Sequence, residues 1–586
     1  KKMFLRKITT KGRTYLNIIK SYWDDGKTKH KSIASFGCID NINEEEIKKL
    51  GLSLIKYCNE KSNILDIDTA QEKYRKNWGA VRLIKKIWEK FDFPKILKKI
   101  GRGRKIKFNY FSAIFLMLVD RLFTPKSKLG VFEKQSFYYG IEENELHHLY
   151  RALDLLSEKK EELEEYIFDK NTDLFQMSVD VVLYDVTTFH FESVRSDTLR
   201  DFGYSKDCKF NEVQIVMSLL VDLEGRPVGF ELYKGNIYEG HTLKDAIEKI
   251  KKRFKINKLI FIADRAMLSK ENIELIKNSN YEYIISSKLK NKPVQVKEEV
   301  LCKKDYISIS TDDKEEEFKY KEIKIFEVTQ ETINKLEGKV FDTDKLIKLK
   351  DKTFYRKEFY KRLEKLKFSQ QEIIEIIRES VKNDRIICSW SNKRARKDKH
   401  DRDRLIEKAK NMVEKNRGRL LSQKGALRYI DIASTVTGKL KYEQIQQDEK
   451  WDGYYGIETN CDITSAEKIL EYYHQLWRVE ESFKVFKSHL ETRPMFHWNP
   501  NRIRGHMVLC FIAFLIERTI EIELKRASID YSTTKIREAI AGLQFSEITV
   551  EDKTFFLRSP VRGLANDILR VFRIKIPPYI TTPDNF

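Results

Sequence analysis

TSAEKILEYYHQLWRVEESFKVFKSHL, the segment from Thr464 to Leu490, has a clear helix pattern. Thr464 and Glu467 have the spacing of a capping box, in which two side chains accept hydrogen bonds from backbone N–H groups of the first helical turn. At 3.6 residues per turn, six apolar residues then share one face: Tyr472, Leu476, Val479, Phe483, Phe486 and Leu490. The segment therefore predicts an amphipathic helix that packs on a hydrophobic core.

A second stripe on this predicted helix consists of Tyr473, Trp477, Glu480, Lys484 and Lys487. Glu480 lies next to the buried face on this stripe. One interpretation is an i,i+4 ion pair between Glu480 and Lys484 on a solvated surface. The other is a functional carboxylate, and it depends on which acidic residues the fold brings to the same place.

Residues 179–287 have the pattern of an α/β sheet. Three strand-like segments, SVDVVLYDVTTFHFES, NEVQIVMSLLVD and PVGFELYKGN, follow one another with short connections. A helix, the strand KLIFIAD, another helix and the strand YEYIISS come next. Three tightly joined strands followed by alternating helices and strands indicate an antiparallel start that continues into parallel βαβ units. This order matches an RNase H-like mixed sheet.

Two aspartates occupy unusual positions in these strands. Asp185 interrupts the apolar run VVLYDVTTF, and Asp264 ends the strand LIFIAD. An unpaired charge in such surroundings is costly, although each aspartate alone can be explained as a turn former or cap. In an RNase H-like sheet the first and fourth strands are parallel neighbours, so the two aspartates would lie side by side. Glu480 from a helix on that sheet would complete an oxygen site suited to Mg²⁺ or Mn²⁺.

The composition favours a polyanionic partner. Lys and Arg number 112 and Asp and Glu number 90, which leaves a net charge of +22 on 586 residues. Such an excess suits nucleic acid. The longest apolar run, Met507 to Ile516, is too short to cross a bilayer, and no signal-peptide pattern opens the sequence. We therefore expect a cytoplasmic protein with no membrane partner.

The pattern along the chain divides it into six segments. We expect helices at Ala70 to Phe91, Tyr110 to Phe123 and Glu142 to Phe168, and a strongly basic helical run at 392–413 whose charges fit either a solvated face or a phosphate-binding surface. The expected segments are a small basic β subdomain (1–42), a helical N-terminal DNA-binding region (43–177), the first part of the RNase H-like core (178–290), an insertion subdomain (291–455), the second part of the core with the Glu480 helix (456–528), and a C-terminal helical region that is a candidate for dimerisation (529–586).

Six separated motifs resemble those of the DDE transposases of bacterial insertion sequences, in the cut-and-paste group with a Tyr-x2-Arg-x3-Glu-x6-Lys signature. They are DVTTF around Asp185, GYSKDCKFNEVQ (203–214), GNIYEGHTL (235–243), ADRAMLS (263–269), DGYYGIETN (452–460) and YHQLWRVEESFKVFK (473–487). The motifs keep the family's order from about residue 180 to 520. The resemblance implies an RNase H-like DDE catalytic core with an insertion subdomain.

The resemblance also implies roles for individual residues. Asp185, Asp264 and Glu480 would be catalytic and would hold two Mg²⁺ ions, with Mn²⁺ able to substitute. The DNA-binding residues would be Tyr473, Trp477, Arg478, Lys484, Lys487 and Lys206. The sequence departs from the signature at one position, because Leu476 stands where the family has Arg and Arg478 is the nearest guanidinium. Plain packing is the alternative for Trp477.

The expected function is a DNA transposase that hydrolyses phosphodiester bonds at transposon ends and joins the 3′-OH ends to target DNA. Its expected partners are double-stranded DNA, as terminal inverted repeats and as target, and a second copy of the chain in a homodimer. The implied location is the bacterial cytoplasm, on the nucleoid when bound to DNA. Two alternatives remain: an RNase H-like nuclease that cuts without joining, and a non-catalytic DNA-binding descendant.

Overall fold

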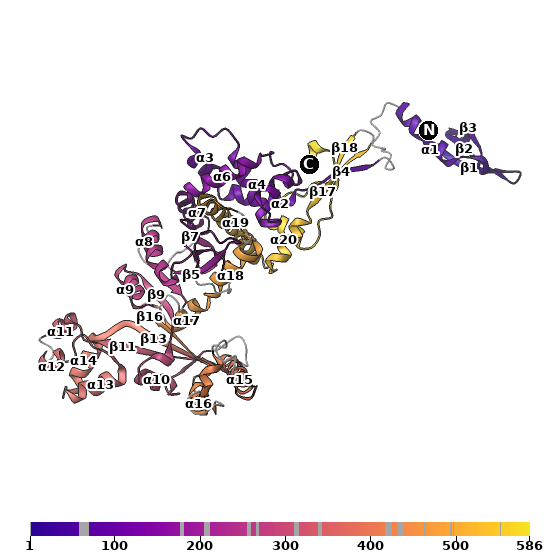
Figure 1. The fold of residues 1–586 in the computed structure, drawn as a ribbon. Helices are drawn as coiled ribbons and strands as arrows, with labels where there is room; N and C mark the ends of the chain where they lie inside the picture. The colour runs from indigo at the N-terminus through magenta and orange to yellow at the C-terminus, as the bar shows by residue number, and fades with distance from the viewer. Residues whose placement is uncertain are drawn as a thin grey trace. The chain divides into compact units, whose positions relative to one another are not determined.

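The computed structural model describes residues 2–57, 70–175, 181–203, 211–254, 259–264, 269–309, 316–337, 343–415, 425–431, 439–461, 464–492, 495, 497–550 and 553–586. The chain divides into two compact units. One comprises Lys1–Arg75, Phe545–Arg558 and Pro577–Phe586, and the other comprises Lys76–Gln544 and Ser559–Ile576. Figure 1 gives the element labels used below.

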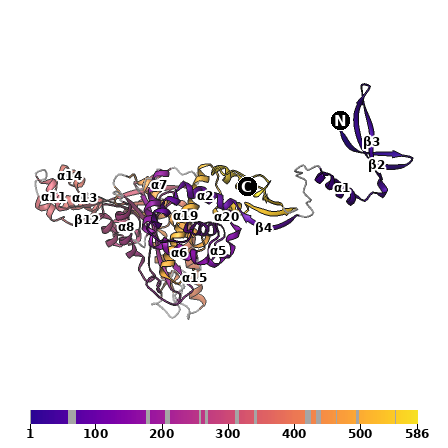
Figure 2. The ribbon, with the colours of Figure 1, turned by 90° about the horizontal axis from the view of Figure 1, so that it is seen from above.

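The first unit begins with a three-stranded antiparallel sheet of β1 (Met3–Thr10), β2 (Arg13–Asp24) and β3 (Lys27–Cys38). The turns that join the strands are Lys11-Gly12 and Asp25-Gly26, and all four residues have positive φ. Such two-residue turns match the twist of a hairpin. The predicted basic sheet is therefore confirmed, and it continues into η1 (Ile39–Asn41) and α1 (Glu44–Tyr57), as Figure 2 shows.

A second sheet joins distant parts of the sequence. Its order is β19-β18-β17-β4, with β4 (Gln71–Asn77), β17 (Gln544–Val550), β18 (Lys553–Arg558) and β19 (Ile580–Thr581). The helix expected from Ala70 is therefore wrong over its first residues, and the C-terminal region expected to be helical contains these strands beside α20 (Thr533–Ala541), α21 (Leu564–Val571) and η9 (Pro583–Asn585). Local periodicity misses β4 because its partner β17 lies more than 400 residues away and most of its side chains are exposed.

The second unit opens with a helical layer. Its elements are α2 (Gly79–Lys90), α3 (Phe93–Gly101), α4 (Tyr110–Phe123), α5 (Lys128–Lys134), η3 (Gln135–Phe137), α6 (Leu146–Glu158) and α7 (Lys160–Phe175). Helices α4 and α6 pack on α19 (Pro500–Arg526), whose side chains are buried almost continuously from Ile503 to Ile520. The apolar helix predicted here is confirmed. Among the described helices, none combines the length and hydropathy that a bilayer span requires.

The central sheet has the strand order β10-β11-β13-β16-β9-β8-β5-β6-β7, with β12 paired to β11. Its first strands in sequence are β5 (Val181–His190), β6 (Gln214–Val221), β7 (Pro227–Lys234), β8 (Ile260–Ala263) and β9 (Glu282–Ser287). β5, β6 and β7 are antiparallel, whereas β8 pairs with both β5 and β9 in parallel. Numbered in chain order, these five strands lie in the order 3-2-1-4-5. The predicted α/β fold with an RNase H-like mixed sheet is confirmed.

Residues 289–459 extend this sheet beyond β9. The strands are β10 (Ile307–Ile309), β11 (Phe318–Glu327), β12 (Thr353–Tyr355), β13 (Val381–Ser391) and β16 (Tyr454–Thr459), and β14 (Ile430–Asp431) pairs with β15 (Lys439–Leu440) separately. The remaining elements are η6 (Leu289–Asn291), α10 (Val294–Leu301), α11 (Gln330–Leu336), α12 (Thr343–Ile347), α13 (Arg356–Lys365), α14 (Gln370–Ser380), α15 (Asn392–Lys415), η7 (Ala426–Tyr429) and α16 (Tyr442–Glu449). The basic run at 392–413 thus forms a helix, as expected.

The helix predicted from Thr464 to Leu490 is divided in the structure. It consists of α17 (Ala466–His474), α18 (Trp477–Lys484) and a π-helical turn, η8 (Val485–His489). Ser465, and not Thr464, caps it by accepting a hydrogen bond from the Lys468 N–H, so the predicted capping box is wrong. The carboxylate of Glu467 instead accepts a hydrogen bond from the Tyr320 hydroxyl of β11. The i,i+3 hydrogen bonds around Leu476 tighten the chain between the two helices.

Candidate active site

The register of β5 and β8 brings Asp185 and Asp264 to the same level of the central sheet. Tyr184 of β5 is paired with Ala263 of β8 in parallel register. Asp185 and Asp264 are the next residue on each strand, so continuing the register by one residue sets them opposite each other. Adjacent strands lie about 4.8 Å apart. The sequence prediction that these two aspartates are neighbours therefore follows directly from the observed pairing.

Strand alternation assigns both aspartates to one face of the sheet. Val181 and Leu183 of β5 belong to the same core cluster as Ile260 and Ile262 of β8. The residues between them contact the other core, which is formed with α8 (Thr242–Phe254) and α9 (Lys270–Asn278). Because side chains alternate along a strand, Asp185 and Asp264 belong with the first set. Asp185 is half-buried and accepts a hydrogen bond at 2.7 Å from the Val186 N–H, whereas Asp264 is exposed.

The helix that carries Glu480 covers this same face. Val479 and Phe483 of α18 are buried in the core cluster that contains Leu183, and α18 packs on β5 and β6 (Figure 1). Glu480 follows the buried Val479 and is itself exposed at the edge of the packed surface. The sheet and the helix thus present three carboxylates on one side of the molecule, two from strands and one from the helix.

The carboxylate oxygens of Asp185, Asp264 and Glu480 do not all lie within 4.8 Å of one another. Within the described part of the chain, the group of His, Cys, Asp or Glu side chains whose ligand atoms all lie within 4.8 Å of one another is Glu145, His147 and His148 at the start of α6. Glu145 and His148 form the capping box of that helix, which explains their proximity. Carboxylates of like charge repel at short range, so a closer approach of Asp185, Asp264 and Glu480 requires a cation between them.

Lys487 lies over the same face of β5. Its ammonium nitrogen is 5.8 Å from the ring centroid of Phe189, a cation–π distance, and the side chain is half-buried. Phe189 is four residues beyond Asp185, so it points to the same side of the sheet. The π-helical turn that contains Lys487 shifts its phase relative to α18. Lys484, one turn after Glu480, is exposed.

Tyr473 is within the electrostatic influence of Asp264 and joins a polar row that the sequence did not predict. The Tyr455 hydroxyl of β16 donates a hydrogen bond to the Tyr473 hydroxyl at 2.6 Å. Burial is the main reason why the pKa of both phenols is raised, and the negative charge of Asp264 acts in the same direction. The guanidinium of Arg394, at the start of α15, lies 4.5 Å from the ring centroid of Tyr455. Through Arg394, the basic helix α15 thus contacts the end of the sheet at which Asp264 lies.

Trp477 and Arg478 lie differently on α18. Trp477 has half of its surface exposed. Arg478 points to the turn between β6 and β7, because its Nε donates to Gln475 at 2.7 Å and its Nη1 donates to the Glu224 carbonyl at 3.5 Å. Burial lowers the pKa of Arg478, and the charge of Arg518 lowers it further. The guanidinium of Arg478 is thus hydrogen-bonded to other groups of the protein. Lys206 lies outside the described residues.

Tyr455 and Arg394 were not predicted from the sequence as site residues. Tyr455 belongs to the motif DGYYGIETN, and Arg394 belongs to the basic run, so both lay inside segments already identified. Their association could be inferred only with the pairing of β16 to β9 and β13, which places the motif next to α15 and α17. The donor chemistry of the site fits a hard divalent cation, because all three candidate ligands are carboxylates.

Comparison with known proteins identifies the family. The family model described as "Transposase DDE domain" matches residues 178–516, and the model described as "IS1634 family transposase, N-terminal domain" matches residues 5–66. No curated protein matches the chain. One similar solved structure is the piggyBac transposase synaptic complex with hairpin DNA, at 8% identity over 79% of this chain and 78% of that chain, with a TM-score of 0.32.

A second similar structure is the Mos1 transposase paired-end complex with the left transposon end, at 8% identity over 31% of this chain and 60% of that chain, with a TM-score of 0.14. The two family models, and not the similar solved structures, show the family. The DDE-domain model spans more than half of the chain, from just before β5, the strand that contains Asp185, to within α19. The chain therefore belongs to the DDE transposases of insertion sequences, which cleave and join DNA with the help of divalent metal ions.

Proposed function

We propose that Asp185, Asp264 and Glu480 are the catalytic carboxylates of this DNA transposase and that they hold two Mg²⁺ ions, with Mn²⁺ able to substitute. The observation that supports this assignment most directly is the parallel register of β5 and β8, which sets the two aspartates opposite each other. Helix α18 packs on that same face and carries Glu480. A site made only of carboxylates selects a hard cation.

The residues around the carboxylates would bind the DNA. Lys484 and Lys487 would hold the phosphate next to the scissile bond, and Tyr473 would contact the backbone beside Asp264. Trp477 has the exposed ring that stacking on an unpaired base requires. When bound, the divalent ions would activate the attacking oxygen and stabilise the charge that develops on the phosphate. The protein side chains orient the strand, so that first water and then a DNA 3′-OH can attack at one place.

The segments outside the core would supply recognition and assembly. We assign end recognition to residues 1–177 and dimerisation to residues 529–586. A homodimer is the arrangement in which both ends of an element are processed together. Light scattering of the chain mixed with end DNA would distinguish two chains per complex from one.

The direct test is an assay of cutting and joining with the purified chain. A plasmid that carries the inverted repeats flanking the coding sequence should be cut at those ends in Mg²⁺, and EDTA should prevent the cut. A separate duplex with a free 3′-OH end should be joined to a target plasmid. Cutting without joining would instead indicate a nuclease, and neither reaction under any divalent ion would contradict the proposed function.

Salt dependence gives a second prediction, for Lys484→Met. The wild-type affinity for end DNA should fall steeply as salt rises from 50 to 200 mM, because each phosphate contact releases a counterion. If Lys484 contacts a phosphate, the variant should bind all sequences more weakly, and the slope of log K against log salt should decrease by about 1. Fluorescence anisotropy at five salt concentrations measures both quantities.

Lys468→Met is the matched control for Lys484→Met. Lys468 is an exposed lysine on α17 that pairs with Glu471 at 2.8 Å, so it has a local partner and lies away from Glu480. Its replacement should leave the salt slope unchanged. An unchanged slope in Lys484→Met as well would remove Lys484 from the DNA interface.

A further inference from the structure

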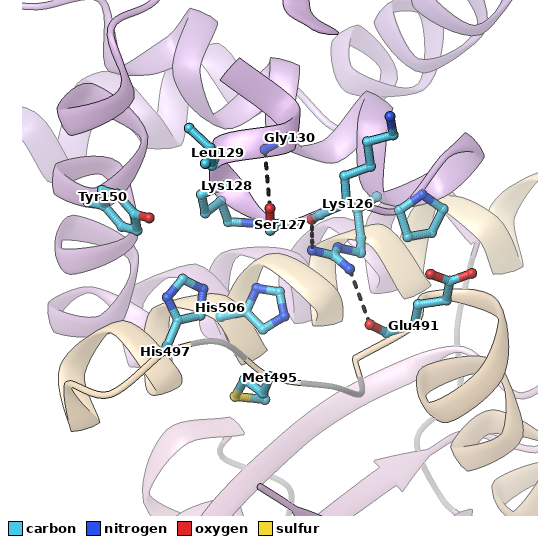
Figure 3. A pocket seen from close by; sticks show the side chains of 12 residues that line it. Lys126, Ser127, Lys128, Leu129, Gly130, Tyr150, Glu491, Met495, His497 and His506 are labelled. Carbon is cyan, nitrogen blue, oxygen red and sulfur yellow. Dashed lines mark hydrogen bonds between the residues drawn. The ribbon is translucent and has the colours of Figure 1, made fainter. Parts of the chain in front are cut away.

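A cavity of about 520 Å³ lies away from the carboxylates, where α4, α5 and α6 meet the loop that precedes α19 (Figure 3). Its walls carry an unusual number of cationic and imidazole groups: Arg121, Lys126, Lys128, His497 and His506. The walls also include the apolar side chains of Leu129 and Met495 and the ring of Tyr150. The volume is in the range of small-molecule sites and exceeds what a single inorganic anion fills.

Three of these basic side chains are almost fully removed from solvent. The exposed fractions are 5% for Arg121, 3% for Lys128 and 3% for His506. Figure 3 shows His497 and His506 side by side below Lys128. A buried cation is normally paired with a carboxylate, since isolated charges are strongly disfavoured in a protein interior. Arg121 therefore gives the cavity a buried positive charge, whereas burial lowers the pKa of Lys128, His497 and His506 and leaves them as bases that a bound anion can help to protonate.

The protein itself only partly compensates this charge. Arg121 donates its Nη hydrogens to the backbone carbonyls of Leu490, Glu491 and Lys126, which are neutral acceptors. Asp120 is the buried acid of this region, and it accepts hydrogen bonds from the Tyr138 hydroxyl and the Lys126 N–H. One carboxylate thus faces both the buried guanidinium of Arg121 and the buried amine of Lys128.

His506 contributes an unused hydrogen-bonding group. Its Nε2 lies 3.6 Å from the Cys510 sulfur, whereas its Nδ1 is buried and has no hydrogen-bond partner among the described residues. A buried polar atom without a partner destabilises the folded state. His506 lines the cavity, so a ligand that accepts or donates a hydrogen bond there would satisfy it.

We propose that this cavity binds a phosphate group, either free or at the end of a nucleic acid strand. A tetrahedral anion can accept hydrogen bonds from several donors at once, which suits Lys128, His506 and the remaining N–H of Arg121. The volume left beside it, lined by Tyr150, Leu129 and Met495, can hold an organic group attached to the phosphate. Glu491 also lines the cavity but is exposed and negatively charged, so the anion belongs at the buried side near Lys128. The inference stands independently of the catalytic carboxylates.

The protonation state of Lys128 should change when an anion binds in the cavity. Burial, together with the repulsion of Arg121, lowers the pKa of Lys128 to about 7. At pH 8 the free protein therefore carries mostly neutral Lys128, and an anion that binds beside it should draw a proton onto it. The charges of Arg121, Asp120 and Cys510 act on this ammonium, and its charge in turn lowers the pKa of His497 and His506. Lys126 and Glu491 line the same cavity.

The first experiment uses the full chain and inorganic anions. Phosphate and sulfate should raise the Tm by a few degrees relative to chloride at equal ionic strength. Sulfate does not titrate near pH 8, so calorimetry in two buffers of different ionisation enthalpy should show net proton uptake on binding. Lys128→Met should weaken anion binding at least about tenfold and abolish the proton uptake. The unliganded variant should melt at the same or a higher temperature, because an apolar side chain replaces a buried amine that, within the ranges the structure describes, has no hydrogen-bond partner to lose.

A matched control variant and a measurement on the wild-type chain distinguish a lost anion site from misfolding of Lys128→Met. Lys95→Met replaces an exposed lysine of α3 and should leave anion binding unchanged. In the wild-type chain, Lys128 should react with an acetylating reagent at pH 8 more slowly when phosphate is present, while Lys95 reacts at a constant rate. Mass spectrometry measures both rates without any substitution.

The source of the phosphate is distinguished by two DNA probes. A short single strand with a 5′-phosphate and the same strand without it should differ in affinity only if the cavity takes a strand end, and Lys128→Met should remove the difference. If inorganic phosphate alone gives the Lys128-dependent response, the ligand is free phosphate. The absence of a Lys128-dependent response to every one of these probes would overturn the proposal.

Discussion

Asp185→Asn, Asp264→Asn and Glu480→Gln are each expected to lower the rate of DNA end cleavage by at least about 10³-fold, because metal-assisted charge stabilisation contributes several kcal/mol and each 1.4 kcal/mol is tenfold in rate. These substitutions keep the size of the side chain and remove only its charge. Binding of end DNA should persist, since the phosphate contacts come from other residues. Gel assays of strand cleavage and anisotropy measurements of binding, on the same preparations, separate the two effects.

Glu481→Gln is the matched control for Glu480→Gln. Glu481 is the next residue on α18, but its carboxylate pairs with Arg518 of α19 at 3.1 Å, on the side of the helix away from Glu480. The control should cleave at the wild-type rate. Normal cleavage by any one of the three carboxylate variants would exclude that residue from the catalytic site, and equal losses in Glu481→Gln would point to a damaged helix.

The strand order of the core could be predicted from the sequence because each signal was local. β5, β6 and β7 are short apolar segments with tight connections, and the later strands alternate with helices. The handedness and neighbourhood rules for such segments leave few arrangements. That β5 and β8 are neighbours follows from that order alone, whereas the level of Asp185 beside Asp264 depends on the register, in which Tyr184 pairs with Ala263.

The helix that carries Glu480 shows where local periodicity reaches its limit. Its apolar stripe was predicted correctly, and Val479, Phe483 and Phe486 are buried. The break at Leu476 and the π-helical turn after Lys484 were not predicted, because both keep the apolar side chains near the expected face. Only the packing of α18 against β5 and β6 decides how the helix bends.

Long-range pairing accounts for the remaining errors. β4 and β17 lie at opposite ends of the chain, and neither has the apolar alternation of a strand that covers a core. The row from Asp264 through Tyr473 and Tyr455 to Arg394 likewise joins segments that are distant in sequence. Composition identified each segment, but only the folded sheet brings them together.

Arg253→Met is expected to destabilise the second unit by about 3–5 kcal/mol, the usual range for removing one partner of a buried ion pair. Arg253 on α8 donates to Glu164 of α7 and, at 3.1 Å, to Glu231 of β7. The side chains of Glu164 and Glu231 are only 1% and 11% exposed. Without the guanidinium, the carboxylates of Glu164 and Glu231 have only Lys160 and Lys249 as cationic partners among the described side chains. The variant also loses the side chain that connects α8 to both α7 and the edge strand β7.

The pH dependence distinguishes this electrostatic effect from a packing defect. Burial raises the pKa of Glu164, whereas Glu231, held by three cations, has a lowered pKa. Removing Arg253 should raise the pKa of both carboxyls in the folded state. The variant therefore loses most stability where both groups are ionised, and the loss should shrink as falling pH protonates them. A difference in Tm between variant and wild type that is larger at pH 8 than at pH 5 checks this.

Arg570→Met is the control for this substitution. Arg570 pairs with Asp567 at 3.1 Å on α21, and its side chain is 72% exposed, so solvent screens the pair. Its loss should change stability by less than about 1 kcal/mol at either pH. A pH-independent loss in Arg253→Met would assign the effect to the missing hydrocarbon contacts of the side chain, and a loss as small as that of the control would show that the lysines alone balance the two buried carboxylates.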